Sequence, residues 1–184
     1  TNTAGKPWLR EKSVLIRNAV EEAWLLQPEL REDRSQQRQI VIGYIGALDF
    51  WFDIEAVEKA ARKHPEWRFE LVGRVEDTHI RRRLAGLANV HFRGEIPHGE
   101  LHDWLAEFDV GLIPFLRNEL TMGTNPIKLY EYFSHGMPVV SVRLPELEDY
   151  RQLVYLYQHS AEFVTQLERA VEEPPGAMRR ERMR

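Results

Sequence analysis

Apolar and polar positions follow two periods along the chain, and the two periods alternate in a regular order. Short apolar runs rich in β-branched residues predict buried strands, whereas apolar positions three and four residues apart predict amphipathic helices. The pattern predicts strands at 40–45, 67–72, 90–92, 110–115, 138–142 and 153–157. It predicts helices at 53–63, 77–87, 100–108, 126–135 and 160–171, and a short helix near Glu146.

Strands that alternate with helices in this way predict a parallel sheet joined by right-handed crossovers. The runs IVIGYI, DVGLIP and MPVVSV are almost entirely apolar, which is typical of strands covered on both faces. We therefore expect an α/β fold with a Rossmann-like doubly wound parallel sheet. Such sheets bind ligands beyond the carboxyl ends of their strands, at the topological switch point, so the functional residues are expected in the loops after the strands.

Composition narrows the classes of function. A length of 184 residues predicts one domain with a full core, and the net charge of −4 argues against nucleic acid as a partner. The chain has no cysteine, which excludes disulfides and zinc thiolates, and its histidines lack a metal-ligand spacing. No metal and no cofactor are expected. Because no apolar run approaches the ~20 residues that span a bilayer, we expect a cytoplasmic chain without an integral membrane segment.

The segment TMGTNPIKLYEYFSHGMPVV, residues 121–140, is the most informative part of the sequence. Pro126 suits the first position of a helix, and Gly136 suits the position just past its end. The loop 123–125 therefore leads into a helix N-terminus. Such an end binds anions readily, because its N–H groups are free and its dipole favours negative charge.

Two charged residues lie within this predicted helix. Lys128 and Glu131 are three residues apart and so share a face. A cation and a carboxylate beside a helix N-terminus could hold a diphosphate and a ribose. The same two residues could instead form a solvated surface pair, and their spacing alone leaves the two interpretations at even odds.

The string PIKLYEYFSHGMPVVS resembles the signature of the retaining GT-B glycosyltransferases of family four. Four other segments are similar to that family in order and spacing: LIRNAV, GYIGALDFWFD, WRFELVGR and NVHFRGEIPHGELHDWLAEFDVGLIPF. The resemblance covers about residues 13–172. It implies the C-terminal, donor-binding half of a GT-B fold. The implied partners are a nucleotide-diphosphate-sugar donor, bound as substrate, and an N-terminal acceptor domain that this chain does not contain.

The resemblance also implies roles for individual residues. Glu131 matches a glutamate that accepts hydrogen bonds from the donor ribose, and Asn125 and Pro126 match the loop whose backbone meets the phosphates. Gly46 matches a glycine that lets the backbone approach the diphosphate or sugar, and Ile96 matches a contact to the base. The expected donor-binding residues are Gly46, Arg74, Ile96, Gly123, Thr124, Asn125, Pro126, Lys128, Leu129 and Glu131, with Lys128 and Glu131 as the catalytic pair.

The chain departs from the family pattern in two places. Gly123 stands where many relatives have the first glutamate of a pair, and the loop 47–51 lacks the Arg and Lys that many relatives use on the diphosphate. Arg74 and Arg117 are the candidates to replace that charge, whereas Asp49 would repel phosphate. These departures resemble a bacterial subgroup with a P-x-K-L-Y-E-Y motif, which favours a role in bacterial cell-surface polysaccharide biosynthesis.

We divide the chain into an interdomain segment with an irregular stretch (1–39), a nucleotide-sugar-binding domain (40–172) and a truncated helical tail (173–184). The expected reaction is metal-independent transfer of a hexose with retention, and the fragment alone is expected to be inactive. Membrane association is expected only through the missing domain or a lipid-linked acceptor. The alternatives are a non-catalytic nucleotide-binding or regulatory α/β domain and another GT-B-fold enzyme, such as a sugar-nucleotide epimerase.

Overall fold

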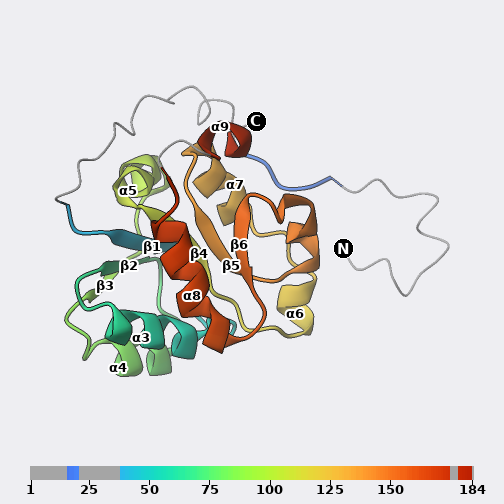
Figure 1. Ribbon diagram of the computed structural model, residues 1–184. Helices are drawn as coiled ribbons and strands as arrows, with labels where there is room; N and C mark the ends of the chain where they lie inside the picture. The colour runs from blue at the N-terminus through green and yellow to red at the C-terminus, as the bar shows by residue number, and fades with distance from the viewer. Residues whose placement is uncertain (1–15, 21–37, 175–177, 184) are drawn as a thin grey trace.

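The protein, described here from a computed structural model over residues 16–20, 38–174 and 178–183, is built on one six-stranded sheet (Figure 1). The strand order is β3-β2-β1-β4-β5-β6, and all neighbouring strands pair in parallel. The strands are β1 (Val41–Ile45), β2 (Arg68–Val72), β3 (Val90–Gly94), β4 (Val110–Ile113), β5 (Val139–Val142) and β6 (Val154–Tyr157). This order confirms the predicted Rossmann-like doubly wound fold.

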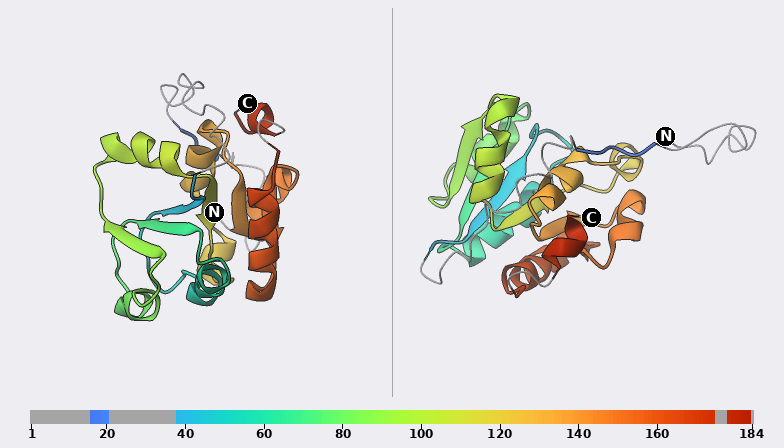
Figure 2. Two further views of the ribbon diagram at one scale, coloured as in Figure 1. Left: turned by 60° about the vertical axis from the view of Figure 1, so that its left-hand side comes forward. Right: turned by 90° about the horizontal axis from the view of Figure 1, so that it is seen from above.

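Helices cover both faces of the sheet (Figure 2). They are α3 (Ile54–Lys63), α4 (Thr78–Leu84), α5 (Leu101–Glu107), α6 (Glu119–Met122), α7 (Ile127–Ser134), α8 (Ser160–Val171) and α9 (Arg179–Arg182), with 3₁₀ helices η2 (His98–Glu100) and η3 (Pro145–Tyr150). α3 packs against both α4 and α8 on one face, and α5 and α7 lie on the other. From β1 the chain adds β2 and β3 on one side of the sheet and then β4, β5 and β6 on the other. The order of the strands therefore reverses between β1 and β4, which makes this boundary the switch point.

Two glycines at the switch point allow the helical layer to pack closely on the sheet. Gly43 of β1 lies in register with Gly111 of β4. A Cβ atom on Gly43 would lie 1.9 Å from the Phe108 ring, and one on Gly111 would lie 2.6 Å from the Tyr132 ring. A side chain at either glycine would therefore clash with one of these rings. Because Tyr132 belongs to α7, its close contact with Gly111 places α7 directly over the boundary between β1 and β4.

The predicted helix bounds were close, with two corrections around α7. Pro126 is the N-cap of α7 and not its first helical residue. The predicted loop 123–125 follows directly on a helix that was not predicted, α6, which begins with a reciprocal capping box between Asn118 and Thr121. Gly136 does lie just past the end of α7, at φ 62°, where it donates to the Phe133 carbonyl. Most of the predicted irregular stretch 1–39 lies outside the described residues.

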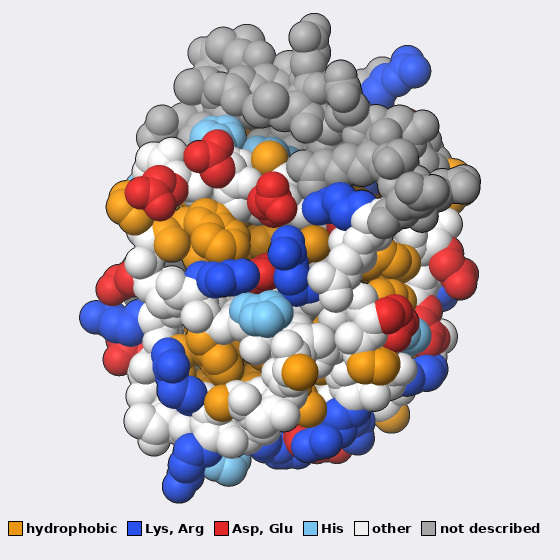
Figure 3. Space-filling view, turned by 90° about the vertical axis from the view of Figure 1, so that its left-hand side faces the viewer, with side chains coloured by type: hydrophobic (Ala, Val, Ile, Leu, Met, Phe, Trp, Pro, Cys, Tyr) orange, Lys and Arg blue, Asp and Glu red, His pale blue; other side chains and the backbone are white. Residues whose placement is uncertain are grey.

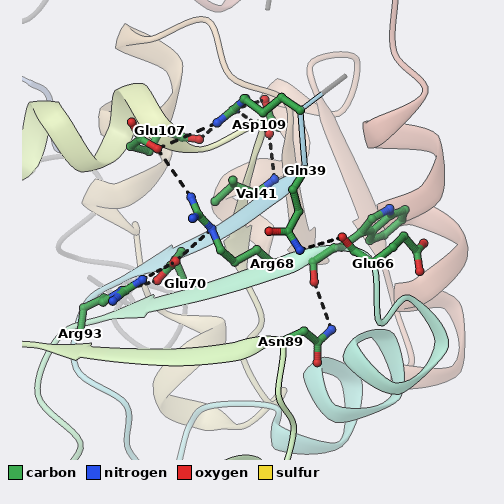
Figure 4. A network of polar contacts seen from close by, with 11 residues as sticks. Gln39, Val41, Glu66, Arg68, Glu70, Asn89, Arg93, Glu107 and Asp109 are labelled. Atoms are coloured by element: carbon green, nitrogen blue, oxygen red, sulfur yellow. Dashed lines mark hydrogen bonds and ion pairs between the residues drawn. The ribbon is translucent and has the colours of Figure 1, made fainter. Parts of the chain in front are cut away.

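A network of paired charges lies on the part of the sheet formed by β1, β2 and β3 (Figure 4). The carboxylate of Glu70, in the middle of β2 and with a side chain only 1% exposed, accepts two hydrogen bonds from Arg93, at 2.6 and 2.8 Å, and forms an ion pair with Arg68. Asp109, just before β4, accepts hydrogen bonds from Arg38 and from the backbone N–H of Val41. On the β3 side of the molecule, acidic and basic side chains lie next to one another (Figure 3). The contacts join β3 to β2, and the start of β1 to the residue before β4.

No helix among the described residues is long and apolar enough to cross a membrane.

Candidate functional site

Tyr132 holds α7 at the carboxyl edge of the sheet. Its hydroxyl accepts a hydrogen bond from the Ile45 N–H of β1 at 3.1 Å and donates one to the Leu112 carbonyl of β4 at 3.2 Å. The side chain therefore bridges the two strands where they separate. Burial raises its pKa well above the ordinary value, so the hydroxyl keeps its proton. The helix face one turn earlier is thereby placed at the switch point.

Lys128 lies on that face, in the first turn of α7. Its ammonium nitrogen is 4.9 Å from the centre of the Phe115 ring and 5.2 Å from that of Tyr44. A Cβ atom added to Gly46 would lie 3.2 Å from the same nitrogen. Gly46, at φ 132° after β1, therefore gives the lysine access to the end of the strand. Gly46 and Lys128, which are both in the predicted donor-binding set, therefore lie next to each other.

The electrostatics of Lys128 are those of a buried cation. Burial lowers its pKa to about 8, and the nearby Glu131 carboxylate offsets only part of this effect. Among the described residues the ammonium forms no ion pair within 4 Å. It is thus available to a negatively charged group that enters from solvent.

Glu131 lies one turn further along α7 and is 8% exposed. Burial raises the pKa of its carboxyl group, while Lys128 and then His98 lower it. Within the described part of the chain, no hydrogen bond to this carboxylate is found. A carboxylate accepts hydrogen bonds and does not donate them, so its natural partners are hydroxyl or N–H groups of a ligand. The solvated-pair interpretation of Lys128 and Glu131 does not fit this burial.

A pocket of about 240 Å³ adjoins these residues at the carboxyl ends of β1, β2 and β3. Its lining includes Gly46, Arg74 and Ile96 of the predicted set, together with Glu95 and His98. His98 also lowers the pKa of Glu131, so it links this pocket to that carboxylate. The structure therefore brings predicted site residues from the loops after β1, β2 and β3, and from α7, to one edge of the sheet.

The loop before α7 is more constrained than the sequence indicated. The N–H groups of Gly123 and Thr124 donate to the carbonyls of Leu120 and Thr121, at 3.2 and 3.1 Å. They are thus occupied, because α6 uses them. The N–H groups of Ile127 and Lys128, in the first turn of α7, make no hydrogen bond to any described residue. These two groups are the donors on which an anion at this helix end must rely.

Other predicted contacts also need adjustment. The Arg74 side chain is 63% exposed and forms an ion pair with Glu76 at 2.6 Å, so it lines the pocket but is already partnered. Leu129 is fully buried, and its N–H donates to the Pro126 carbonyl, so it is a core residue of α7. Arg117 does not line this pocket. It lines a larger one, of about 680 Å³, that shares the Phe115 ring with Lys128.

The sequence did not predict two participants. His98 comes to Glu131 from the 3₁₀ helix η2, and no spacing rule links residues so far apart in the chain. Asn18 hydrogen-bonds to Asn125 through both its backbone and its side chain. LIRNAV, the string that contains Asn18, had been identified only as resembling an interdomain segment.

Comparison with protein families matches residues 39–173 to the model described as "Glycosyl transferases group 1". Among curated proteins, the chain is 28% identical over 172 residues to the putative teichuronic acid biosynthesis glycosyltransferase TuaH of Bacillus subtilis (strain 168). The match covers 88% of this chain but 43% of that protein. The chain therefore spans less than half the length of this relative.

Solved structures share the fold at low identity. A glycosyltransferase from Rickettsia africae matches with TM-score 0.63 at 10% identity, over 87% of this chain and 47% of that one. Anabaena Alr3699/HepE, solved in complex with UDP and glucose, matches with TM-score 0.58 at 16% identity, over 84% of this chain and 44% of that one. The catalytic domain of starch synthase IV from Arabidopsis thaliana, bound to ADP and acarbose, matches with TM-score 0.61 at 17% identity, over 88% and 36%.

Proposed function

The chain belongs to the group 1 glycosyl transferases, and from this premise we propose that it is the donor-binding half of a retaining, metal-independent hexosyltransferase. The donor is a nucleoside-diphosphate sugar, and it binds at the carboxyl edge of the sheet between α7 and the ends of β1, β2 and β3. The acceptor is a saccharide of a cell-surface polymer, by analogy with TuaH, the putative teichuronic acid biosynthesis glycosyltransferase.

One observation carries this proposal: Glu131, 8% exposed, and the part-buried Lys128 lie at the switch point, and neither side chain forms a hydrogen bond or a close ion pair with a described residue. Holding a cation and a carboxylate in this state is costly. The burial shifts both pKa values toward the neutral forms, which is characteristic of functional sites. A nucleoside diphosphate supplies both missing partners, since its phosphates are anionic and its ribose hydroxyls are hydrogen-bond donors.

Each group then has a role. Glu131 accepts hydrogen bonds from the ribose hydroxyls, and the base lies in the pocket beside Ile96. Lys128 and the free N–H groups at the start of α7 hold the diphosphate. During transfer, the bond between the sugar and the diphosphate breaks and negative charge grows on the departing phosphate oxygen. Lys128 stabilises this charge in a site from which water is largely excluded.

A second domain completes the site. Several large apolar side chains are exposed around the same carboxyl edge, namely Phe50 (58%), Leu116 (43%), Leu120 (57%) and Ile127 (48%). Exposed apolar groups gathered on one side of a protein favour a contact surface. We assign it to the acceptor-binding domain, because the chain spans less than half of its relatives. Without that domain the acceptor is not oriented, so the isolated chain should bind donor and transfer no sugar. The cytoplasmic location stays a prediction.

Isothermal titration calorimetry tests the proposal. Wild-type protein is titrated with UDP, ADP and GDP and with the matching nucleosides, and at least one diphosphate should bind more tightly than its nucleoside. Glu131→Gln should weaken that diphosphate and its nucleoside alike, by about 1–3 kcal/mol, because both carry the ribose. Glu66→Gln, at an exposed glutamate outside the site, is the matched control. If no nucleotide binds, or if Glu131→Gln binds like wild type, the proposed site is wrong.

A further inference from the structure

The segment of residues 16–20 runs beside the loop between α6 and α7 (Figure 2). Asn18 forms two hydrogen bonds with one residue of that loop, Asn125, although 107 residues separate them in the chain. Its backbone N–H donates to the Asn125 side-chain oxygen Oδ1 at 2.9 Å. Its side-chain nitrogen Nδ2 donates to the Asn125 carbonyl at 2.7 Å. The pairing uses the side chain of each asparagine and the backbone of the other.

Asn125 is held from the other side as well. Its Nδ2 donates to the Tyr130 hydroxyl at 3.1 Å, and Tyr130 belongs to α7 itself. Oδ1, Nδ2 and the backbone carbonyl of Asn125 are thus each engaged. The next residue, Pro126, is the N-cap of α7 with φ −74°, and its ring limits rotation. The orientation of the peptide that enters α7 is therefore set by Asn18 and Tyr130.

Neighbouring contacts anchor the segment independently of Asn125. Arg17 hydrogen-bonds to Asp149 and forms a longer ion pair with Glu146, both in η3. The segment would stay on the surface if the Asn18 side chain were removed. The side-chain bond to the Asn125 carbonyl thus has a separable effect, which is to hold that carbonyl toward Asn18. A carbonyl dipole turned toward the site would repel a phosphate and compete with the N–H donors of Ile127 and Lys128.

We propose that Asn18 is a positioning residue for the donor diphosphate: it holds the Asn125 carbonyl so that the first N–H groups of α7 face the phosphates. The inference rests on the proposed donor-binding function. It assigns a binding role to a segment that lies ahead of the sheet and contributes no strand to it. Asn18 acts through Asn125 and touches no part of the donor.

The test compares Asn18→Ala with Arg17→Ala in the same protein, titrated with the tightest-binding nucleoside diphosphate and with its nucleoside. Asn18→Ala keeps the backbone bond to Oδ1 and loses only the bond to the carbonyl. Its affinity for the diphosphate should fall about tenfold, the effect of one well-placed hydrogen bond, while nucleoside affinity changes by less than about twofold. Because Asn18 is exposed, the melting temperature should stay within about 2 °C of wild type. Arg17→Ala should keep the wild-type preference for the diphosphate.

A double-mutant cycle sharpens the result. Asn125→Ala removes the other contacts of this peptide, the Oδ1 bond from the Asn18 N–H and the Nδ2 bond to Tyr130, and should reproduce the selective loss. Adding Asn18→Ala to it should cost less than the sum of the two single losses, because both changes release the same peptide. Equal losses for nucleoside and diphosphate, or an Asn18→Ala protein that binds the diphosphate like wild type, would overturn the inference while leaving the donor site intact. If the wild-type protein binds no nucleoside diphosphate, the proposed function fails and the inference fails with it.

Discussion

Buried charge is paired in one part of the sheet and unpaired in another. In the middle of β2, Glu70 is 1% exposed and is bonded to Arg93 and Arg68 (Figure 4). At the carboxyl edge of the sheet, Glu131 is 8% exposed and Lys128 is half-buried, yet neither has a hydrogen-bonding or ion-pair partner among the described residues. Both parts belong to the same fold. The difference therefore reflects what each part does and not how the chain folds.

Buried charges that are paired and hydrogen-bonded cost the folded state little free energy. Buried charges without partners destabilise the folded state until a ligand binds to them. The aromatic groups around Lys128 do not neutralise its charge. Tyr44 and Phe115 place ring faces near the ammonium but supply no anion. The carboxyl edge is thus arranged to receive an anion. This comparison between β2 and the carboxyl edge can be tested by substitutions that change one of the two places at a time.

The largest effect is expected from the same substitution, glutamate to glutamine, made in the middle of β2 and at the carboxyl edge. Glu70→Gln should lower the free energy of unfolding by about 2–3 kcal/mol, somewhat less than for a fully buried pair because both arginines keep partial exposure. Glu131→Gln should leave it unchanged or raise it by less than about 1 kcal/mol, since it removes a buried charge that has no partner. Urea denaturation of both variants measures the difference. Equal destabilisation by the two substitutions would mean that Glu131 is structural.

The next effect concerns pH. The pKa of Lys128 is about 8 in the folded chain, below its ordinary value of 10.5, so the lysine loses its proton as pH rises through 8. Diphosphate affinity should be constant near pH 7 and then fall above pH 8, by at most about tenfold per pH unit. Nucleoside affinity should not change. A Lys128→Met variant should show no such dependence, and a wild-type affinity that is flat to pH 9.5 would contradict the assignment.

Folding stability should respond to the same proton with the opposite sign. A lysine whose pKa is lowered by folding destabilises the folded state fully below the folded value of about 8. That cost is relieved between about 8 and 10.5. Over this window the free energy of unfolding of wild type, measured relative to Lys128→Met, should rise while diphosphate affinity falls.

The smallest effect is expected at Arg74. The sequence favoured it as a replacement for the missing basic residues after β1, but it is exposed and paired with Glu76. Arg74→Ala should change diphosphate affinity by about threefold or less and unfolding by less than about 0.5 kcal/mol. A loss as large as that of Lys128→Met would place the phosphates at the β2 loop instead of at α7.

The alternation of strands and helices could be predicted because each element buries one periodic set of side chains. Ser160–Val171, for example, was predicted at its observed bounds. The grouping of Gly46, Lys128 and Glu131 followed from the switch-point rule and from the family resemblance. α6 was missed because it is four residues long and its apolar pattern is too short to register. Its only signal was the Asn118 and Thr121 capping pair.

The remaining features depend on contacts between distant residues. The pairing of Asn18 with Asn125 and the approach of His98 to Glu131 arise only when the chain is folded. The tail gives a similar case. Residues 173–184 were predicted only as a truncated helical tail, but the Arg182 side chain is fully buried and bonds to Glu173 and to the Leu153 carbonyl. The helical prediction carried no signal for this burial, which depends on the Glu173 carboxylate and on a carbonyl 29 residues away.

The central claim is that Lys128 binds phosphate and Glu131 binds ribose, and one set of titrations tests it most directly. Wild type, Lys128→Met and Glu131→Gln are each titrated with a nucleoside diphosphate and with its nucleoside. Lys128→Met should lose at least about tenfold in affinity for the diphosphate and almost none for the nucleoside, because the lysine charge acts on phosphate alone. Glu131→Gln should lose affinity for both by the same factor. If Lys128→Met weakens the nucleoside and the diphosphate equally, the lysine only packs α7 against the sheet, and the diphosphate does not bind at this helix end.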